Sequence, residues 1–319
     1  MINSSISEQD FNEYSELIEQ GMSQRSACGI LSLCRSSIQR YLKKLNELNV
    51  DITVSDVVTT VDDKVANKPK VLLYDIETTL AKSYHFQQWQ VNLSQKQKIE
   101  ESHLLSIAWC WNDGDVNGDI LSQQEMLEHD DERLVLKLWC LLDNADIVIG
   151  HNLKRFDNKK ANSYFLKYGL NPPSPYRTID TLQIAKSKFA LPFNNLDYIA
   201  EYLNVGRKIS TDIQLWIDCD KGNQEALDNM LDYNKQDVVV LRDVYKRLLT
   251  WGNNNVNMNT YSDDRFSCTN CGSGKVEMIT NKFVHTNTNK YLAYRCNDCG
   301  SVMRSSKSGE VSDKLVMVV

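Results

Sequence analysis

An apolar run that ends in two acids is the feature that most limits how this chain can fold. Residues 71–76 (VLLYDI) form the near-continuous apolar run expected of a central, buried β-strand. Asp75 and Glu77 are two residues apart, so in a strand their side chains point to the same side. Burying two like charges together is costly unless something compensates them. Taken alone, this Asp-x-Glu pattern also fits a solvated strand end.

A second stretch supplies another acid at the start of a predicted helix. A strand over 146–150 leads into the segment NLKRFD, in which Asn152 precedes a helix with Asp157 near its start. We expect Phe156 to anchor that helix in the core while Asp157 faces the site. The neighbouring Lys154 and Arg155 are suited to phosphate groups, although each also fits a solvated helix face.

A third stretch lies on a long helix predicted from about residue 224 to 249. Tyr233 and Asp237 are four residues apart in the segment YNKQD, which places them one turn apart on the same face. A metal-binding acid and a phenol in this arrangement can bind a cation and hold a water molecule. Because all the candidate ligands are oxygens, the chemistry favours a divalent cation such as Mg²⁺ or Mn²⁺.

Alternating strands and helices across the central segment predict an α/β fold with a mixed sheet flanked by helices. The predicted strands cover 71–76, 104–111, 119–121 and 147–149, and the predicted helices cover 133–142, 156–168, 180–188, 196–203 and 224–249. Asp180 begins one of these helices, and we interpret it as a helix-start acid that serves the N-terminal dipole. The histidines at 85, 103, 129 and 285 show no spacing suited to catalysis, and we interpret them as structural or surface residues.

The three stretches together resemble the DnaQ-like 3′–5′ exonucleases of the RNase H-like superfamily, in the subclass with tyrosine in the last motif. The segments YDIETT and HNLKRFD are most similar to the proofreading domains of family B DNA polymerases and their stand-alone relatives. The resemblance covers residues 71–251 and implies an RNase H-like fold. It also implies roles for residues: the metal-binding acids would be Asp75, Glu77, Asp157 and Asp237, Tyr233 would orient the attacking water, and Asn152 would contact substrate or support the site. Together with Asn152, the expected substrate-binding residues are Phe156, Lys154 and Arg155.

The chemistry that this resemblance implies is hydrolysis assisted by two Mg²⁺ or Mn²⁺ ions about 4 Å apart. Asp75 would bridge the ions, and the products would be nucleoside 5′-monophosphates released from DNA 3′ ends, single-stranded ends being favoured. RNA remains an open alternative as substrate. A separate replication or recombination protein is the expected partner, and a role in DNA repair or replication, in a phage or mobile element, is the expected setting.

The first 50 residues predict a small all-α module of three short helices. Two of these helices resemble a helix-turn-helix of the resolvase or homeodomain-like kind, which implies contact with duplex DNA. The alternative is a three-helix bundle that only packs or dimerises. Residues 51–70 are polar and read as a linker. The residues expected on the groove-reading helix are Ser36, Ser37, Gln39 and Arg40.

Two CxxCG segments near the end of the chain predict a small β module that holds one structural Zn²⁺. Glycine allows the tight turn that brings two thiolates onto one ion, and the segment between the pairs is long enough for a β-hairpin. This is the pattern of a zinc ribbon over 265–319, preceded by an Asn-rich spacer over 252–264. A redox-active dithiol pair is the alternative, and the ribbon's partner, nucleic acid or protein, stays open. The four predicted zinc ligands are Cys268, Cys271, Cys296 and Cys299.

Overall composition places limits on these hypotheses. The formal net charge is −6, so no global basic field attracts nucleic acid, and any contact must come from local basic patches or from bound cations. The first ten residues show no signal-peptide pattern and no apolar run reaches membrane-spanning length, so a cytoplasmic protein is expected. Two other functions stay open: a transposase-like recombinase, in which the same fold performs strand transfer, and a DNA-binding regulator with an inert nuclease core.

Overall fold

The computed structural model describes residues 14–16, 69–86, 89, 92–207, 209, 211–252, 256–262 and 266–307. Of the predicted N-terminal module it describes only Tyr14–Glu16, which are helical. The predicted groove-reading residues Ser36, Ser37, Gln39 and Arg40 lie outside the described residues, as does nearly all of the predicted linker.

A mixed sheet forms the centre of the fold, as the sequence predicts. Its strands lie in the order β5-β4-β1-β6-β7. Strand β1 pairs with β4 in antiparallel register and with β6 in parallel register, and β4 pairs with β5 in antiparallel register. The bounds of these strands are β1 Val71–Thr78, β4 Leu104–Trp111, β5 Asn117–Ile120, β6 Ile147–Gly150 and β7 Arg177–Asp180.

The helices agree with the predicted ranges to within a few residues. Two helices, α4 and α9, are additional to those predicted, and Asp180 caps α7 by accepting a hydrogen bond from the backbone N–H of Leu182, which confirms its helix-start role. The bounds are α4 Gln123–Glu128, α5 Glu132–Asn144, α6 Asp157–Lys167, α7 Thr181–Lys188, α8 Leu196–Leu203, α9 Ile213–Asp220 and α10 Gln224–Leu248. Short 3₁₀ helices are η1 Gln95–Gln97, η2 Leu249–Trp251 and η3 Met258–Tyr261.

Two smaller β elements accompany the central sheet. Strands β2 (Lys82–Ser83) and β3 (Lys98–Glu100) form an antiparallel pair, which the sequence analysis did not predict. Near the end of the described chain, β8 (Val276–His285), β9 (Lys290–Cys296) and β10 (Val302–Arg304) form an antiparallel sheet in the order β10-β9-β8. A small β module after the α/β region is therefore confirmed.

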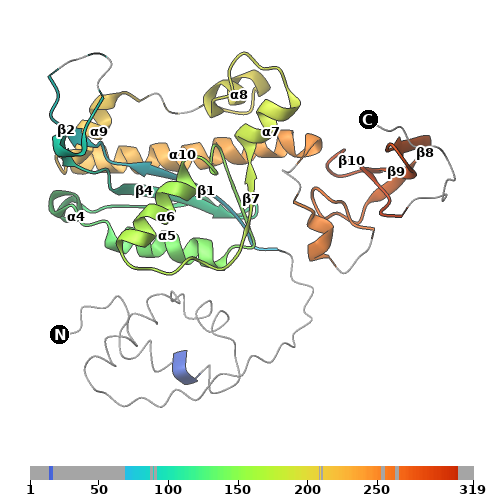
Figure 1. Cartoon of the computed structure of the whole chain (residues 1–319), viewed down its shortest axis with the longest axis horizontal. Helices are drawn as coiled ribbons and strands as arrows, with labels where there is room; N and C mark the ends of the chain where they lie inside the picture. The colour runs from blue at the N-terminus through green and yellow to red at the C-terminus, as the bar shows by residue number, and fades with distance from the viewer. Residues whose placement is uncertain are drawn as a thin grey trace. The chain divides into compact units, whose positions relative to one another are not determined.

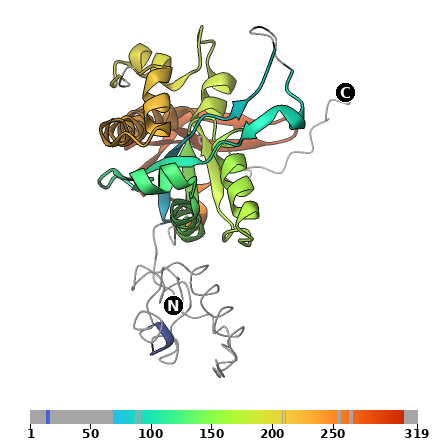
Figure 2. The same cartoon turned by 90° about the vertical axis from the view of Figure 1, so that its left-hand side faces the viewer.

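The described chain divides into two compact units. The first contains the described residues of 1–63, 70–176 and 208–239, and the second contains those of 64–69, 177–207 and 240–319. In the first unit, α5 and α6 lie on one face of the sheet and the first part of α10 lies on the other (Figures 1 and 2). Helix α10 continues from one unit into the next.

Strand alternation decides which residues of β1 face which layer. Leu72, Tyr74 and Ile76 belong to the buried hydrophobic core. Successive side chains in a strand point to opposite faces, so Asp75 and Glu77 point to the other face, where they meet Asn234 and Asp237 of α10. The α/β core thus places both acids of β1 beneath one helix.

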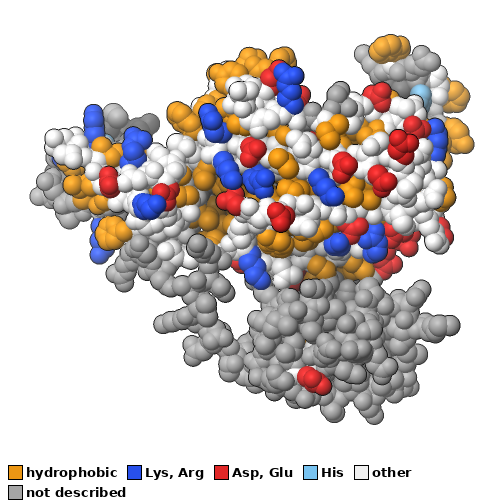
Figure 3. Space-filling model, turned by 180° about the vertical axis from the view of Figure 1, so that it is seen from behind, with side chains coloured by type: hydrophobic (Ala, Val, Ile, Leu, Met, Phe, Trp, Pro, Cys, Tyr) orange, Lys and Arg blue, Asp and Glu red, His pale blue; other side chains and the backbone are white. Residues whose placement is uncertain are grey.

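Charged side chains of both signs are interspersed on the face of the molecule drawn in Figure 3. That distribution agrees with the formal net charge of −6 and the absence of a global basic field. Among the described helices, none has the length and apolar character needed to cross a bilayer.

Candidate active site

Three carboxylates from distant parts of the sequence converge in the first unit. Asp75 and Glu77 lie on β1 and Asp237 lies on α10, and one oxygen of each lies within 4.8 Å of the others. Asp237 is buried, whereas the two acids of β1 are partly exposed. Like charges this close repel one another, and a cation bound between them would compensate that repulsion. Three of the four predicted metal-binding acids are therefore brought together.

The helical spacing of α10 explains why Asp237 faces the sheet. Its buried positions recur every three or four residues, which is one face of a helix. Leu227, Met230 and Leu241 are apolar members of that buried stripe, and Asn234 and Asp237 are its two polar members. The buried stripe of α10, otherwise apolar, therefore places the Asn234 amide and the Asp237 carboxylate next to the acids of β1.

Asn234 connects the helix directly to the first acid. Its Nδ2 donates a hydrogen bond of 2.8 Å to Oδ2 of Asp75, and its Oδ1 accepts one of 3.0 Å from Oγ of Ser106. Ser106 on β4 lies opposite Glu77 in the strand register, and both Ser106 and Asn234 are fully buried. These two consecutive hydrogen bonds fix the orientation of the Asn234 amide, and the amide in turn fixes the position of the Asp75 carboxylate. Neither Ser106 nor Asn234 is among the site residues predicted from the sequence.

Tyr233 is held next to the acid-bearing face by an aromatic contact. Its ring meets that of Trp216 on α9 edge to face, with the ring centroids 6.0 Å apart and the planes at 72°. Such pairs add about 0.5–1.5 kcal/mol beyond the apolar area they bury. Tyr233 precedes Asp237 by one helical turn, as predicted, so the phenol and the carboxylate share a side of α10.

Asp157 begins α6 and is buried, but its carboxylate is not among the three that converge within the described residues. The side chain nevertheless lies within electrostatic reach of the same region. Burial raises the pKa of Tyr74 well above its ordinary value, and the negative charges of Asp157 and Asp75 raise it further. Tyr74 remains protonated and donates a 2.6 Å hydrogen bond to Oδ1 of Asn158.

Asn152 has a backbone role in the structure. Its φ is 68°, in the left-handed region that asparagine tolerates better than most residues. Its carbonyl oxygen accepts hydrogen bonds from the N–H groups of Arg155 and Phe156, at 3.1 and 3.0 Å. The turn carries the chain from β6 into α6 and so sets the position of Asp157.

A groove of about 1070 Å³ lies between the β2–β3 segment and α6. Two of the predicted substrate-contacting residues, Arg155 and Phe156, line it, whereas Asn152 and Lys154 are not part of its lining. Phe156 is 41% exposed, so it does not anchor the helix in the core as predicted; Leu153, which is fully buried, takes that place. Further lining cations are Lys82, Lys98, Lys159, Lys160 and Lys167.

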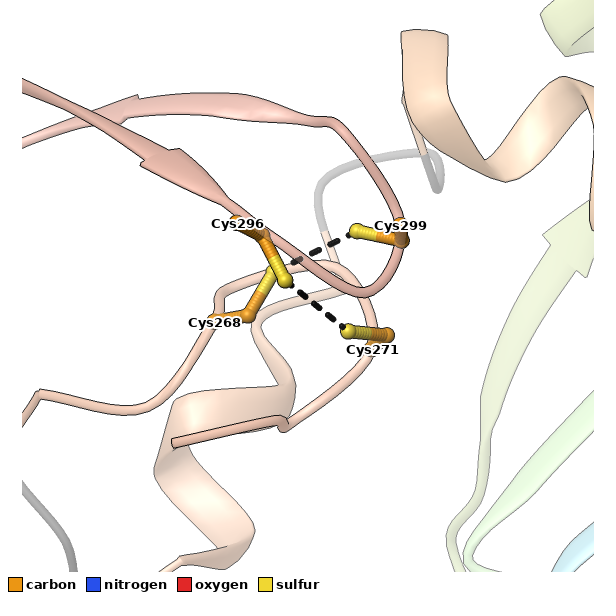
Figure 4. Close-up of side chains that lie close together, drawn as sticks. All are labelled: Cys268, Cys271, Cys296 and Cys299. Atoms are coloured by element: carbon orange, nitrogen blue, oxygen red, sulfur yellow. Dashed lines mark hydrogen bonds between the residues drawn. The ribbon is translucent and has the colours of Figure 1, made fainter. Parts of the chain in front are cut away.

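The four predicted zinc ligands converge in the second unit (Figure 4). Sγ of Cys268 lies 3.6 Å from that of Cys299, and Sγ of Cys271 lies 3.6 Å from that of Cys296. A tetrahedral site with Zn–S distances of about 2.3 Å has sulfur–sulfur distances of about 3.8 Å, close to the two observed values. All four thiols are free of disulfides.

Both cysteine turns have the same backbone hydrogen bonding, which explains the glycine after each pair. The N–H of Gly272 donates to the carbonyl of Cys268, and that of Gly300 donates to the carbonyl of Cys296, each at 2.9 Å. The two glycines have φ of 76° and 75°. Burial raises the pKa of Cys271 and of Cys299. Burial also acts to raise the pKa of Cys268, but hydrogen bonds with Ser301 and with backbone N–H groups outweigh it and lower that pKa to about 7, which favours the thiolate at this one position.

Comparison with known proteins identifies the family of the central region. The family model described as the RNase_H superfamily matches residues 72–249. Among solved structures, the family B DNA polymerase of the hyperthermophilic archaeon Pyrobaculum calidifontis is 15% identical with a TM-score of 0.43, and the match covers 57% of this chain and 25% of the polymerase chain. A search of curated proteins found no match.

Proposed function

The chain belongs to the RNase H superfamily, and on that premise we propose that it is a metal-dependent 3′–5′ exonuclease that acts on DNA. Membership of this superfamily supports a nuclease-type function in general. The proposal adds the direction of cutting, a preference for single-stranded 3′ ends and the release of nucleoside 5′-monophosphates. It also assigns the enzyme to the subclass with tyrosine in the last motif.

The observation that carries the proposal is the convergence of Asp75, Glu77 and Asp237 within 4.8 Å. Purely oxygen donors favour hard cations such as Mg²⁺ and Mn²⁺, and this set carries a formal charge of −3 when ionised. Asn234, a neutral amide, donates a hydrogen bond to Asp75, and a neutral donor adds no positive charge to this set.

The three convergent carboxylates would hold the divalent cations, and we assign Asp157 to the same site as a fourth ligand. When bound, the cations would lower the pKa of a coordinated water and stabilise charge on the leaving oxygen. Tyr233 would hold the attacking water by a hydrogen bond from or to its hydroxyl group. Trp216 would keep the phenol ring in place.

The groove beside α6 supplies a path for the nucleic-acid strand. Among the described residues, the side chains of Arg155 and Lys159 have no ion-pair partner, so both remain available to phosphate groups. The exposed ring of Phe156 offers a surface on which a base can stack. Other cations of the groove are already engaged: Lys167 lies 2.9 Å from Asp131, and Lys160 donates to Ser102.

The remaining parts of the chain would serve recruitment. We propose that the cysteine cluster binds one structural Zn²⁺ in a zinc ribbon over 265–319, that the exonuclease domain covers 71–251, and that the first 50 residues form a DNA-binding helix-turn-helix. Partners would be DNA and a replication or recombination protein. Repair or replication in a phage or mobile element, and a cytoplasmic location, belong to the same proposal.

The test is an assay of the full chain on 5′-labelled single- and double-stranded DNA with Mg²⁺, Mn²⁺ or EDTA. Stepwise shortening from the 3′ end that requires the cation supports the proposal. Joined products would identify a recombinase, and DNA left intact under every condition would identify a binding protein. A parallel single-stranded RNA substrate decides between the two nucleic acids.

A further inference from the structure

A second group of potential ligands lies in the first unit, in a different chemical class from the three acids. Glu100, His103 and His129 each offer one ligand atom, and these atoms lie within 4.8 Å of one another. Glu100 ends β3, His103 lies between β3 and β4, and His129 follows α4. The spacing of the two histidines in the sequence gives no sign of a cluster and predicts structural or surface residues.

The distances between these atoms suit a single ion. Oε1 of Glu100 lies 2.9 Å from Nδ1 of His129 and 3.9 Å from Nδ1 of His103. In a tetrahedral site with metal–ligand distances of about 2.0–2.1 Å, two ligand atoms lie about 3.3 Å apart. The observed separations of 2.9 and 3.9 Å lie on either side of this value. The two imidazole rings are 5.2 Å apart and tilted by 42°, so they are not stacked face to face.

Two of the three atoms are buried without a hydrogen bond to any residue that the structure describes. Those atoms are Oε1 of Glu100 and Nδ1 of His103. Nδ1 of His129 lies 2.9 Å from Oε1, a contact that is an ion pair only when the imidazole is protonated and that does not have hydrogen-bond geometry. A buried polar atom that makes no hydrogen bond is costly. A cation shared by the three atoms would satisfy both Oε1 of Glu100 and Nδ1 of His103.

The other carboxylate oxygen of Glu100 is already fixed. Lys82 on β2 lies 3.0 Å from Oε2 of Glu100 and 2.7 Å from Oδ2 of Asp220 on α9. In metal sites, a carboxylate that binds the ion through one oxygen is commonly oriented by a contact to its other oxygen. The backbone of His103 is also fixed, because its N–H donates to Oγ1 of Thr79 and its carbonyl accepts from the N–H of Thr79.

We propose that Glu100, His103 and His129 bind one borderline divalent transition-metal ion, Zn²⁺ being the reference case. Two imidazoles and one carboxylate favour such ions over Mg²⁺, which prefers oxygen ligands. Glu100 and His103 line the groove beside α6, so the ion would tie the β2–β3 segment to the loop after α4 along that groove. The site is separate from the three acids and from the cysteine cluster, and it stands whether or not the chain is a nuclease.

The test counts metal ions in the full chain and does not depend on activity. Wild-type protein and variants are equilibrated with Zn²⁺ in excess Mg²⁺, which occupies oxygen-only sites, and the retained zinc per chain is measured. His129→Asn is the main variant, because His129 has a φ of 54° and asparagine tolerates that left-handed conformation. The control is His285→Asn, which removes one imidazole from an exposed strand end.

The expected result is that His129→Asn retains one zinc equivalent fewer than the wild type, while His285→Asn retains the same number. His103→Gln should lose the same equivalent. With Co²⁺ in place of zinc, the lost equivalent should contribute visible d–d absorption without a thiolate charge-transfer band, which distinguishes it from the cysteine site. Equal zinc content in the wild type and His129→Asn would overturn the proposal and leave a Glu100–His129 ion pair only. A lost equivalent that carries thiolate bands would also overturn it.

Discussion

Asn234 on α10 donates a hydrogen bond of 2.8 Å to Oδ2 of Asp75 on β1, and this bond joins the helix to the strand at the candidate active site. The amide is oriented in turn by the hydroxyl of Ser106. Only one orientation of the amide satisfies both neighbours, so the Asn234 side chain holds Oδ2 of Asp75 in a defined position.

This relationship predicts that Asn234 positions a metal ligand. Asn234→Ala should lower exonuclease activity by about 10–100-fold, the loss typical of residues that orient metal ligands. The concentration of Mg²⁺ needed for half-maximal rate should rise, which a purely structural defect would not cause. Ser106→Ala should shift this concentration in the same direction by a smaller amount. If Asn234→Ala changes thermal stability but not the Mg²⁺ dependence, the positioning role is wrong.

A double-mutant cycle refines that test. Ser106 acts on Asp75 only through Asn234, so the Ser106→Ala change should have little further effect once Asn234 is alanine. Independent, additive losses of activity would show that Ser106 does not act on Asp75 through Asn234. The measurement is the Mg²⁺ titration of the initial rate for the two single variants and the double variant.

Tyr233 is predicted to affect the rate and not the binding of metal. Tyr233→Phe removes one hydroxyl and retains the edge-to-face contact with Trp216, so kcat should fall by about 10–100-fold with an unchanged Mg²⁺ requirement. Trp216→Ala should reproduce part of this loss, because the phenol ring loses its support, and Trp216→Phe should restore most of it. Equal rates for the wild type and Tyr233→Phe would remove the tyrosine from the mechanism.

The groove beside α6 is predicted to bind the phosphate backbone. Replacing Arg155 and Lys159 by alanine together should raise KM about 10-fold, change kcat little, and reduce the slope of log KM against log salt by about 2. Lys186→Ala provides the matched control, because Lys186 is an exposed lysine of α7 that does not line the groove. An equal rise in KM for this control would indicate a general charge effect and not a defined path.

The cysteine cluster is predicted to hold zinc for structural reasons. Cys268→Ser should remove one zinc equivalent and lower the thermal stability of the C-terminal β module, since metal binding supplies folding free energy to small modules of this kind. Hydrolysis of short single-stranded DNA should persist, because the three convergent acids all belong to the first unit. Metal analysis, a melting curve and the nuclease assay on one preparation check the three outcomes. Retained zinc in Cys268→Ser would contradict the assignment.

The sequence predicted three of the four acids that it assigned to the site in positions where they converge, because local periodicity determines where these three point. Alternation in β1 places Asp75 and Glu77 on one face, and the stripe of α10 brings Asp237 toward it. Nothing local predicts Ser106 or Trp216, since their roles depend on the register of β4 against β1 and on the position of α9. Asn234 did carry a signal, as a polar residue on the buried stripe of α10.

The elements that were missed are short or weakly patterned. Strand β7 has the sequence RTID, which alternates too briefly to be distinguished from the start of the following helix. The β2–β3 pair has only two and three residues in its strands. The Glu100–His103–His129 cluster could not be predicted, because three separate elements must fold before the residues meet.

The central claim is that the three convergent carboxylates bind the cations that make hydrolysis possible. The most direct test is thermal unfolding of the wild type, Asp75→Asn and Asp237→Asn with Mg²⁺ and with EDTA, next to the nuclease assay on the same samples. Mg²⁺ should raise the melting temperature of the wild type, as any ligand of the folded state does, and should leave both variants nearly unchanged. In EDTA the variants should be at least as stable as the wild type, because one repelling charge is gone, while their hydrolysis falls by about 100-fold or more. Equal Mg²⁺ stabilisation and equal hydrolysis in Asp75→Asn and the wild type would contradict the account.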